Sequence, residues 1–345
     1  MKIFILKPSS LGDVVHALPV LRLLKRHQPA SEIYWWIDAS LAPLLEGDPD
    51  LTGLVRFERQ RWRSPGHWPE AWQSLRAIRG HAFDWVIDLQ SLARSGTVAW
   101  LANGRFTIGL DDAREGARGF YDSIVSRPSP NAHAVDWYLG VLPALGVPIH
   151  WNFAWLPERP AVAEMVRQKW PQESARWIVL HPGARWPNKR WPVEHAADLV
   201  KLITQAQAEV WFAIIGSRAD RELGRAIVAA GPQRCLDLTG QTSLWEMIEW
   251  IRRSELMITN DTGPMHVAAA LQKPVVALFG PTHPSRTGPY GQLDRVLRSH
   301  LPCAPCLKDS CSHNPPLECL QSISPATVFE VVQQRLNARQ QVAPS

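Results

Sequence analysis

The segment with the clearest chemical signature is residues 255–271, whose pattern predicts a buried strand, a polar turn and the start of a helix. The turn contains Asp261, Thr262 and Gly263, and His266 follows in the first helical turn. N–H groups at a helix start lack intrahelical acceptors and favour an anion, and open parallel sheets bind ligands at the carboxyl ends of their strands. We therefore expect these four residues to bind a small molecule that carries phosphate.

Two charged residues of the second half, Lys189 and Glu222, also follow expected strands. Lys189 lies in a turn rich in proline and tryptophan, where a lysine can meet phosphate as a point charge. The alternative for Lys189 is a solvated basic loop. Glu222 could accept hydrogen bonds from sugar or ribose hydroxyls, or it could be an exposed carboxylate in the first turn of a helix.

Asp13 is the candidate for acid–base chemistry in the first half of the chain. It follows Ser9-Ser-Leu-Gly12, directly after a short apolar run at residues 3–6 and at the start of an expected helix. A carboxylate at the carboxyl end of a strand could act as a general base. The alternative is a helix cap that complements the helix dipole.

Arginine is concentrated in residues 56–63, where four of the eight positions are arginine and Trp62 lies among them. Such a run is usually a solvated face. The same half of the chain contains further cations, so the alternative is a site for an anionic acceptor. The candidates for that site are Lys7, Arg61, Arg63 and Arg94.

Length, composition and charge limit the class of protein. A chain of 345 residues with 46% hydrophobic residues favours a soluble globular protein of two domains. The net charge of +5 suits an anionic ligand, but without a basic stripe we expect no binding to nucleic acid. The apolar run at residues 3–6 is too short for a signal peptide, and no later run reaches the roughly 18 residues of a membrane span. We expect a cytoplasmic protein, with any membrane role peripheral.

Four of the five cysteines form a cluster with the spacing C-x2-C-x4-C-x7-C, and His313 lies inside it. Disulfides are rare in the cytoplasm, so the thiols could be free or could hold a structural metal. The spacing matches no strong zinc motif, and all three states stay open. The candidate ligands are Cys303, Cys306, Cys311 and Cys319.

Short apolar runs alternate with helical patterns along the chain, which predicts an α/β protein with a doubly wound parallel sheet in each half. A proline-rich segment without helical period at residues 148–160 marks the boundary between the halves. We expect domains at residues 1–155 and 156–325, followed by a C-terminal helix and tail at 326–345. The expected strands are residues 3–6, 33–37, 55–57, 85–89, 177–180, 210–215, 256–259 and 275–279, and the expected helices of the first half are 14–26, 71–78 and 132–145.

Several of these motifs together resemble the ADP-heptose:lipopolysaccharide heptosyltransferases of glycosyltransferase family nine. Lys189-Arg-Trp-Pro192 and Asn260-Asp-Thr-Gly-Pro-Met-His266 match the donor signatures, and Ser9-Ser-Leu-Gly-Asp-Val-Val-His16 looks like the acceptor signature. Gln60-Arg-Trp-Arg63 and His133-Ala-Val-Asp136 resemble heptosyltransferase I. The loop at residues 181–189 and the cysteine cluster look closer to heptosyltransferase II, which leaves the acceptor open.

The resemblance implies a GT-B fold, in which two Rossmann-like domains face a central cleft. It implies an inverting transfer of heptose from ADP-heptose to a Kdo residue of lipid A-Kdo at the inner membrane surface. The N-terminal domain would bind the acceptor, with Asp13 as the base, and the C-terminal domain would bind the donor. Lys189 and the turn at residues 261–263 would neutralise the leaving diphosphate, so catalysis would need no metal.

Other functions stay open alongside this one. Transfer to a heptose acceptor, as in heptosyltransferases II and III, differs only in the substrate. A nucleotide-sugar epimerase would use the same fold, although the signature around Asp13 argues against it. A non-catalytic protein that binds anions would also fit the basic charge.

Overall fold

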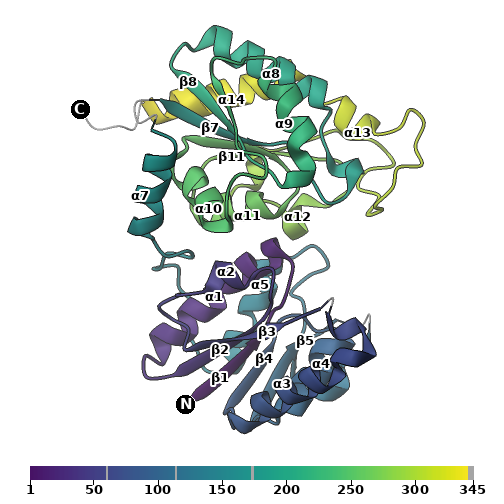
Figure 1. Cartoon of the computed structure of the whole chain (residues 1–345). Helices are drawn as coiled ribbons and strands as arrows, with labels where there is room; N and C mark the ends of the chain where they lie inside the picture. Colours follow the sequence, from purple (N-terminus) through teal and green to yellow (C-terminus); the bar gives the residue numbers. More distant parts are fainter. Residues whose placement is uncertain (60, 113–114, 172–174, 341–345) are drawn as a thin grey trace. The chain divides into compact units, whose positions relative to one another are not determined.

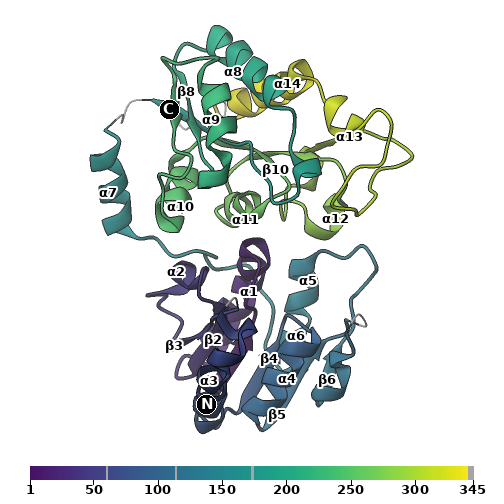
Figure 2. The same cartoon turned by 45° about the vertical axis from the view of Figure 1, so that its right-hand side comes forward.

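The computed structural model describes residues 1–59, 61–112, 115–171 and 175–340, with side chains except at residues 63 and 338–340. The chain forms two compact units, Met1–Pro157 and Glu158–Ser345 (Figures 1 and 2). The sequence predicts this boundary between residues 155 and 156. The end of the tail expected at 326–345 lies outside the described residues.

Unit 1 contains a six-stranded parallel sheet with the strand order β3-β2-β1-β4-β5-β6. Its strands are β1 (Lys2–Leu6), β2 (Glu32–Asp38), β3 (Gly53–Phe57), β4 (Trp85–Asp88), β5 (Phe106–Leu110) and β6 (Ser123–Val125). Its helices are α1 (Leu11–His27), α2 (Ala42–Leu45), α3 (Trp68–Gly80), α4 (Ala93–Ala102), α5 (Ala134–Leu139) and α6 (Val141–Ala144), with 3-10 turns η1 (Arg61–Arg63), η2 (Pro65–His67) and η3 (Ala117–Phe120).

Unit 2 contains a second six-stranded parallel sheet, with the order β12-β11-β10-β7-β8-β9. Its strands are β7 (Arg176–His181), β8 (Val210–Ile214), β9 (Cys235–Asp237), β10 (Leu256–Asn260), β11 (Val275–Phe279) and β12 (Val296–Arg298). Its helices are α7 (Pro160–Lys169), α8 (Val193–Ala206), α9 (Arg221–Val228), α10 (Leu244–Arg253), α11 (Gly263–Ala270), α12 (Pro284–Thr287), α13 (Glu318–Gln321) and α14 (Pro325–Gln340), with η4 (Pro187–Lys189), η5 (Arg218–Asp220) and η6 (Leu293–Arg295).

Both sheets have the same topology, because the first strand of each unit lies in the middle and the chain then winds outward in both directions. The direction of winding reverses between β1 and β4 in unit 1 and between β7 and β10 in unit 2. Doubly wound sheets bind ligands at such a reversal, outside the carboxyl ends of the strands. The turns that follow these four strands are therefore the expected positions of ligand-binding sites.

The central strands are apolar because helices cover both faces of a parallel sheet. Every residue of β10 and β11 is buried, and in β1 every residue after Lys2 is buried. This burial explains why continuous apolar runs, rather than alternating ones, predicted these strands. The strands expected from sequence are all present.

The structure differs from the sequence prediction at less regular elements. Strands β5, β6, β9 and β12 were not predicted, and three of them are only three residues long. The single helix expected at residues 132–145 is divided into α5 and α6 at Gly140. Helix α1 begins at Leu11, three residues earlier than expected, because Ser10 caps it. Within the described residues, no helix has the length and apolar character that crossing a membrane requires.

Candidate active site

The polar turn after β10 forms a charged cluster with two neighbouring turns. The Lys189 ammonium donates a hydrogen bond to Asp261 Oδ2 at 2.6 Å, and the Thr282 hydroxyl donates to the same oxygen at 2.7 Å. The side chains of Lys189 and Asp261 are 18% and 7% exposed. The three residues follow β7, β10 and β11, so they meet at the carboxyl edge of the sheet. A cation fixed beside the start of α11 suits a phosphate ligand.

Asn260, the last residue of β10, holds the loop that carries Lys189. Its buried side-chain amide donates from Nδ2 to the carbonyl of Pro182 at 2.8 Å, and its Oδ1 accepts from the N–H of Trp191 at 3.0 Å. These two contacts lie on either side of Lys189 in the chain. Asn260 therefore fixes the position of the Lys189 loop relative to the end of β10.

His181, at the end of β7, lies beside the same turn. Its Nδ1 is 3.4 Å from the Thr262 hydroxyl. Burial lowers the pKa of His181 to about 4, although the Asp220 carboxylate acts in the opposite direction. The imidazole is therefore neutral near pH 7 and adds no charge to the cluster. Position 183 requires glycine, because a Cβ there would collide with the Asp220 carboxylate.

The remaining predicted donor residues differ in their placement. Thr262 is the N-cap of α11, Gly263 is its first residue, and His266 lies buried within the same short helix. These residues therefore lie in or directly after the turn whose Asp261 contacts Lys189. Glu222 follows the neighbouring strand β8 and lies exposed in the first turn of α9. Its contact with a sugar hydroxyl stays a prediction.

In unit 1, Asp13 lies half-buried in the first turn of α1. Its Oδ2 accepts hydrogen bonds from the backbone N–H of Ser10 at 2.9 Å and from the Ser10 hydroxyl at 2.7 Å. This is the capping arrangement that was the alternative to catalysis. Its Oδ1 accepts from the Tyr138 hydroxyl at 3.3 Å. Because an ionised carboxylate has about four acceptor sites, capping leaves Asp13 able to take a proton.

Lys7 lies at the point where the winding of unit 1 reverses. Its side chain is buried, its ammonium donates to the carbonyl of Leu89 at 2.9 Å, and the same nitrogen is 4.6 Å from the centroid of the Tyr138 ring. The turn after β4 is shaped by the fully buried Asp88, whose Oδ1 accepts from the N–H of Gln90 at 2.8 Å. Tyr138 thus contacts both the predicted base and a predicted acceptor cation.

Arg61 lies in η1 and is paired on the surface. Its guanidinium donates to Glu70 Oε1 at 2.8 Å and to His67 Nδ1 at 3.2 Å. Both partners of the Arg61–Glu70 ion pair are about half exposed, so the pair holds the arginine weakly and an anion can compete for it. The side chain of Arg63, also a predicted acceptor residue, and Gln60 of the same motif lie outside the described residues.

Arg94 and the arginine-rich segment meet at one aromatic ring. The Arg94 guanidinium lies 5.6 Å from the centroid of Phe57, the last residue of β3, and Trp62 packs against Phe57 edge to face at 5.3 Å. The structure therefore brings the start of α4 and the segment at residues 57–62 together. The grouping of Arg61 with Arg94 in one acceptor site stays a prediction.

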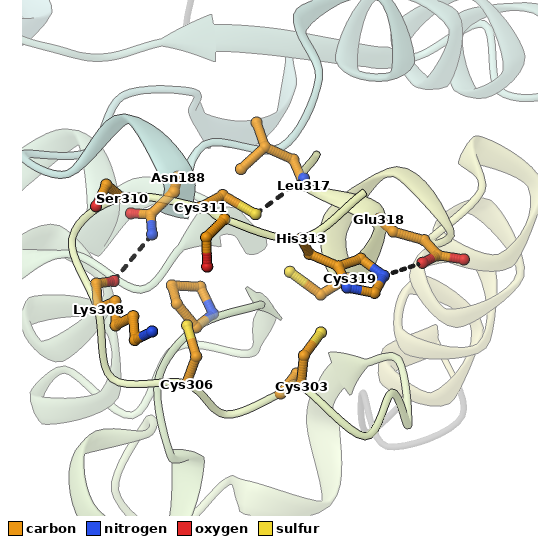
Figure 3. Close-up of a pocket in the computed structure, with 13 residues that line it drawn as sticks. Asn188, Cys303, Cys306, Lys308, Ser310, Cys311, His313, Leu317, Glu318 and Cys319 are labelled. Atoms are coloured by element: carbon orange, nitrogen blue, oxygen red, sulfur yellow. Dashed lines mark hydrogen bonds and ion pairs between the residues drawn. The ribbon is translucent and has the colours of Figure 1, made fainter. Parts of the chain in front are cut away.

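The four clustered cysteines line a single cavity of about 350 Å³ in the loops around α13, together with Asn188 and His313 (Figure 3). Burial, and then the nearby thiols, raise the pKa of Cys319. In the described part of the chain all five cysteines are free thiols, and no three His, Cys, Asp or Glu side chains are placed to hold a metal ion.

The cysteine loop also contacts the turn that carries Lys189. Asn188 donates from Nδ2 to the carbonyl of Lys308 at 2.9 Å, and the Leu307 N–H donates to the carbonyl of Pro281, one residue before Thr282. The cavity therefore borders two of the three turns of the charged cluster.

Sequence reasoning gave no role to several residues that complete the two clusters, namely Tyr138, His181, Asn260 and Thr282. His181 and Asn260 belong to the loop and the motif already singled out, and Thr282 follows the expected strand at residues 275–279, so polar residues at strand ends were the available signal. Tyr138 is separated from Asp13 by 125 residues. Only the packing of α5 against α1 brings them together, and nothing in the local sequence indicates it.

Known proteins that resemble this chain point to one family. The family profile of glycosyltransferase family 9 (heptosyltransferase) matches residues 71–316. Lipopolysaccharide heptosyltransferase 1 of Pseudomonas aeruginosa is 32% identical, over 91% of this chain and 88% of its own. Lipopolysaccharide heptosyltransferase 2 of Salmonella typhimurium is 31% identical, over 86% and 88%. The solved structure of E. coli ADP-heptose LPS heptosyltransferase II has a TM-score of 0.79 at 25% identity and covers 99% of this chain and 100% of its own.

Proposed function

Because the chain belongs to glycosyltransferase family 9, the heptosyltransferase family, we propose that it transfers heptose from ADP-heptose to a Kdo residue of the lipopolysaccharide inner core. The chain is a nucleotide-sugar-dependent glycosyltransferase with a GT-B fold. The proposed donor is the one named for the E. coli structure, and the proposed acceptor is that of a type 1 enzyme, like the P. aeruginosa relative.

The observation that carries the donor assignment is the Lys189–Asp261–Thr282 cluster beside the start of α11. When the glycosidic bond of the donor breaks, its electron pair goes to the oxygen of the leaving ADP. Lys189 would stabilise this negative charge, and the N–H groups at the start of α11 would add to the effect. Asp261 would hold Lys189 and Thr282 in place rather than contact phosphate itself, since two anions repel.

On the acceptor side, Asp13 would remove the proton from the attacking Kdo hydroxyl. The hydroxyl oxygen would form the new bond to the anomeric carbon from the side opposite the leaving ADP, which inverts that centre. The Tyr138 hydroxyl and Ser10 hold the carboxylate in one orientation, and positioning of this kind is a large part of general-base catalysis. Lys7, Arg61, Arg63 and Arg94 would bind the acceptor's anionic groups.

The proposed reaction is tested by mass spectrometry of the product. The full-length protein is offered ADP-heptose with Kdo-lipid A and, in a parallel reaction, with Kdo-lipid A that already carries one heptose. A gain of one heptose on the first acceptor only supports the proposal. A gain on the second acceptor only would assign a type 2 reaction, which the 31% identity to the Salmonella relative makes the second candidate. Consumption of the donor without transfer to either acceptor would contradict both.

A structural metal at the cysteine cluster is a separate proposal, supported by four thiols around one cavity. Zinc bound by four thiolates requires Zn–S distances of about 2.3 Å, so the loop would have to contract around the ion. Its role would be to stiffen the loop that contacts Asn188, with no part in the chemistry. Elemental analysis of protein purified without chelator tests it, and less than a tenth of an equivalent of any transition metal would rule it out.

A further inference from the structure

Unit 1 exposes three tryptophans on two neighbouring helices. Trp68 and Trp72 of α3 are 61% and 53% exposed, and Trp100 of α4 is 61% exposed. Large aromatic side chains are normally buried, and several on one surface mark a site of interaction. Neither the donor nor the acceptor assignment above uses these residues.

Four of the exposed residues of α3 form one stripe along the helix. Trp68, Trp72 and Arg76 are spaced four residues apart, which places them on the same side of the helix, and Arg79 falls on that side as well. The Arg76 guanidinium lies 5.5 Å from the centroid of the Trp72 ring. The buried Ile78 attaches α3 to the rest of unit 1.

Helix α4 presents a similar stripe next to the first one. Arg94, Thr97 and Trp100 are the exposed residues at spacing three, while the residues between them are largely buried. The two helices contact each other and lie side by side in both views (Figures 1 and 2). Helix α3 lies in the connection from β3 to β4, and α4 lies in the connection from β4 to β5. Both connections cross the sheet in the same direction. Because such crossovers are right-handed, both helices lie on the same face of the sheet. Their exposed stripes therefore share one outer surface.

The charge of this surface identifies the kind of partner. Helices α3 and α4 together contain three arginines and one glutamate, a formal excess of two positive charges. Tryptophan together with arginine is the combination found where proteins insert at the interface of an anionic bilayer. A second copy of the chain is a poor partner, because a symmetric contact would bring two basic surfaces together.

We propose that the outer surface of α3 and α4, with Trp68, Trp72 and Trp100 as its apolar anchors, docks unit 1 on an anionic lipid bilayer. The inference deepens the proposed function, on which its biological purpose rests, since the acceptor of that reaction is anchored in a membrane. Arg94 belongs to α4 and also contacts Phe57 beside the arginine-rich segment. Docking through this surface would bring the predicted acceptor arginines close to lipid headgroups.

The first test measures binding to vesicles without donor or acceptor. The full-length protein is sedimented with vesicles of phosphatidylethanolamine and phosphatidylglycerol and, separately, with neutral phosphatidylcholine vesicles. We expect binding to anionic vesicles that weakens in 0.5 M salt, and at least tenfold weaker binding for Trp68→Ala/Trp72→Ala. Trp151→Ala is the matched control, because Trp151 is 48% exposed in unit 1 but lies outside both helices, and it should bind like wild type.

Equal binding of the double variant and wild type would overturn the proposal, as would binding that ignores lipid charge. A dimer in sedimentation analysis that the double variant abolishes would assign the surface to a second copy instead. Circular dichroism and thermal unfolding verify that the double variant is folded. If it is not, Arg76→Glu/Arg79→Glu replaces it, and undiminished binding of that variant to anionic vesicles would equally overturn the proposal.

A second test separates this proposal from the enzymatic one. Transfer by the double variant should have a raised acceptor KM with Kdo-lipid A in vesicles and an unchanged KM with a water-soluble Kdo acceptor that lacks acyl chains. A rise in KM with both acceptors would contradict docking through these residues. Absence of transfer by the wild type would defeat the proposed function, while the vesicle-binding result would still decide the docking surface.

Discussion

Asp13 combines a structural and a proposed chemical role on one carboxylate. Asp13→Asn keeps an oxygen that can accept from Ser10 and so keeps most of the cap, but it loses the basicity. Because a positioned general base contributes about 10² to 10⁴ in rate, we expect kcat to fall by at least about 10². The measurement is kcat together with the affinity for ADP-heptose, which should not change.

Tyr138→Phe provides the comparison for that variant. It removes the hydrogen bond to Asp13 Oδ1 and leaves the carboxylate, so its loss of kcat should be much smaller than that of Asp13→Asn. An Asn variant with kcat near wild type would mean that Asp13 is only a helix cap. A parallel loss of donor affinity would mean that Asp13 belongs to the donor site.

Lys189 is expected to bind the diphosphate of the donor. Lys189→Ala removes a charge-assisted contact worth on the order of 1.5 to 3 kcal/mol, so ADP affinity should fall roughly ten- to hundredfold. Calorimetric titration with ADP and with adenosine distinguishes the phosphate contact, because adenosine affinity should change little. Equal ADP affinity in the variant and the wild type would remove Lys189 from the site.

The ion pair with Asp261 adds a prediction that the sequence alone did not offer. Without Lys189, the buried Asp261 carboxylate would keep its hydrogen bond from Thr282 but would repel the phosphates. Lys189→Ala/Asp261→Asn should therefore bind ADP more tightly than Lys189→Ala alone. Weaker binding by the double variant would show that Asp261 itself contacts the donor favourably, and Asp261 would then be reassigned as a direct ligand.

At the scale of elements, the segment from β3 to α3 contains a matched pair of arginines. Arg61 pairs with Glu70 and Arg56 pairs with Glu46, and all four side chains are about half exposed. Of these two arginines, Arg61 lies in η1, next to Trp62, and Trp62 packs against the Phe57 ring. Arg61→Ala should raise the acceptor KM and flatten its salt dependence, whereas Arg56→Ala should leave both unchanged. Equal effects of the two substitutions on the acceptor KM would indicate general electrostatics rather than a site.

His181, at the end of β7, should make the free energy of unfolding of unit 2 depend on pH. The pKa of His181 falls from its ordinary 6.5 to about 4 in the folded chain, so between these values the unfolded chain binds more protons. The contribution of His181 to the free energy of unfolding is complete above pH 6.5 and is lost as the pH falls toward 4. Roughly 2 kcal/mol is lost between pH 7 and pH 5. Urea unfolding at both pH values measures this, and His181→Gln should show a smaller difference. An equal pH effect in both proteins would attribute the loss to other groups.

The elements that sequence predicted best are those whose burial is uniform. Strands β1, β10 and β11 are continuous apolar runs because both faces are covered, and such runs are visible in any sequence. Strands β6, β9 and β12 are three residues long and partly exposed at or near the sheet edges, so they have too little pattern to detect. In β5 the run is interrupted by Gly109, which is required because a Cβ there would collide with the Tyr121 ring.

The residues of the candidate site could be predicted from sequence, but the contacts between their side chains could not. Asp261, Thr262, Gly263 and Lys189 could be predicted because polar residues at strand ends meet at one sheet edge in this topology. The Lys189–Asp261 pair itself spans 72 residues and depends on the loop geometry that Asn260 fixes. Such side-chain partners depend on tertiary packing, which no local pattern specifies.

At the scale of the whole molecule, two units of identical topology are assigned different ligands. Each places its polar cluster where the sheet winding reverses, but the chemistry differs. Unit 2 has a lysine fixed beside a helix start, which suits a diphosphate. Unit 1 has a carboxylate and a lysine that both contact Tyr138, which suits a hydroxyl close to an anionic group. In this assignment, the same fold would supply a donor site and an acceptor site through differences in the turns after its strands.

The assignment of the donor to unit 2 and of the acceptor to unit 1 predicts which backbone amides each substrate protects from hydrogen exchange. A ligand that binds only the folded state suppresses local opening around its site. ADP alone should slow amide exchange in residues 181–191, 260–266 and 280–282, and a water-soluble Kdo acceptor alone should slow exchange in residues 7–13 and 57–62. Lys189→Ala at the same ADP concentration is the control and should lose the first pattern only. Protection by ADP that is confined to residues 7–13 and 57–62 would reverse the assignment of the two units, because the diphosphate would then be bound by Lys7 and the arginines rather than by Lys189.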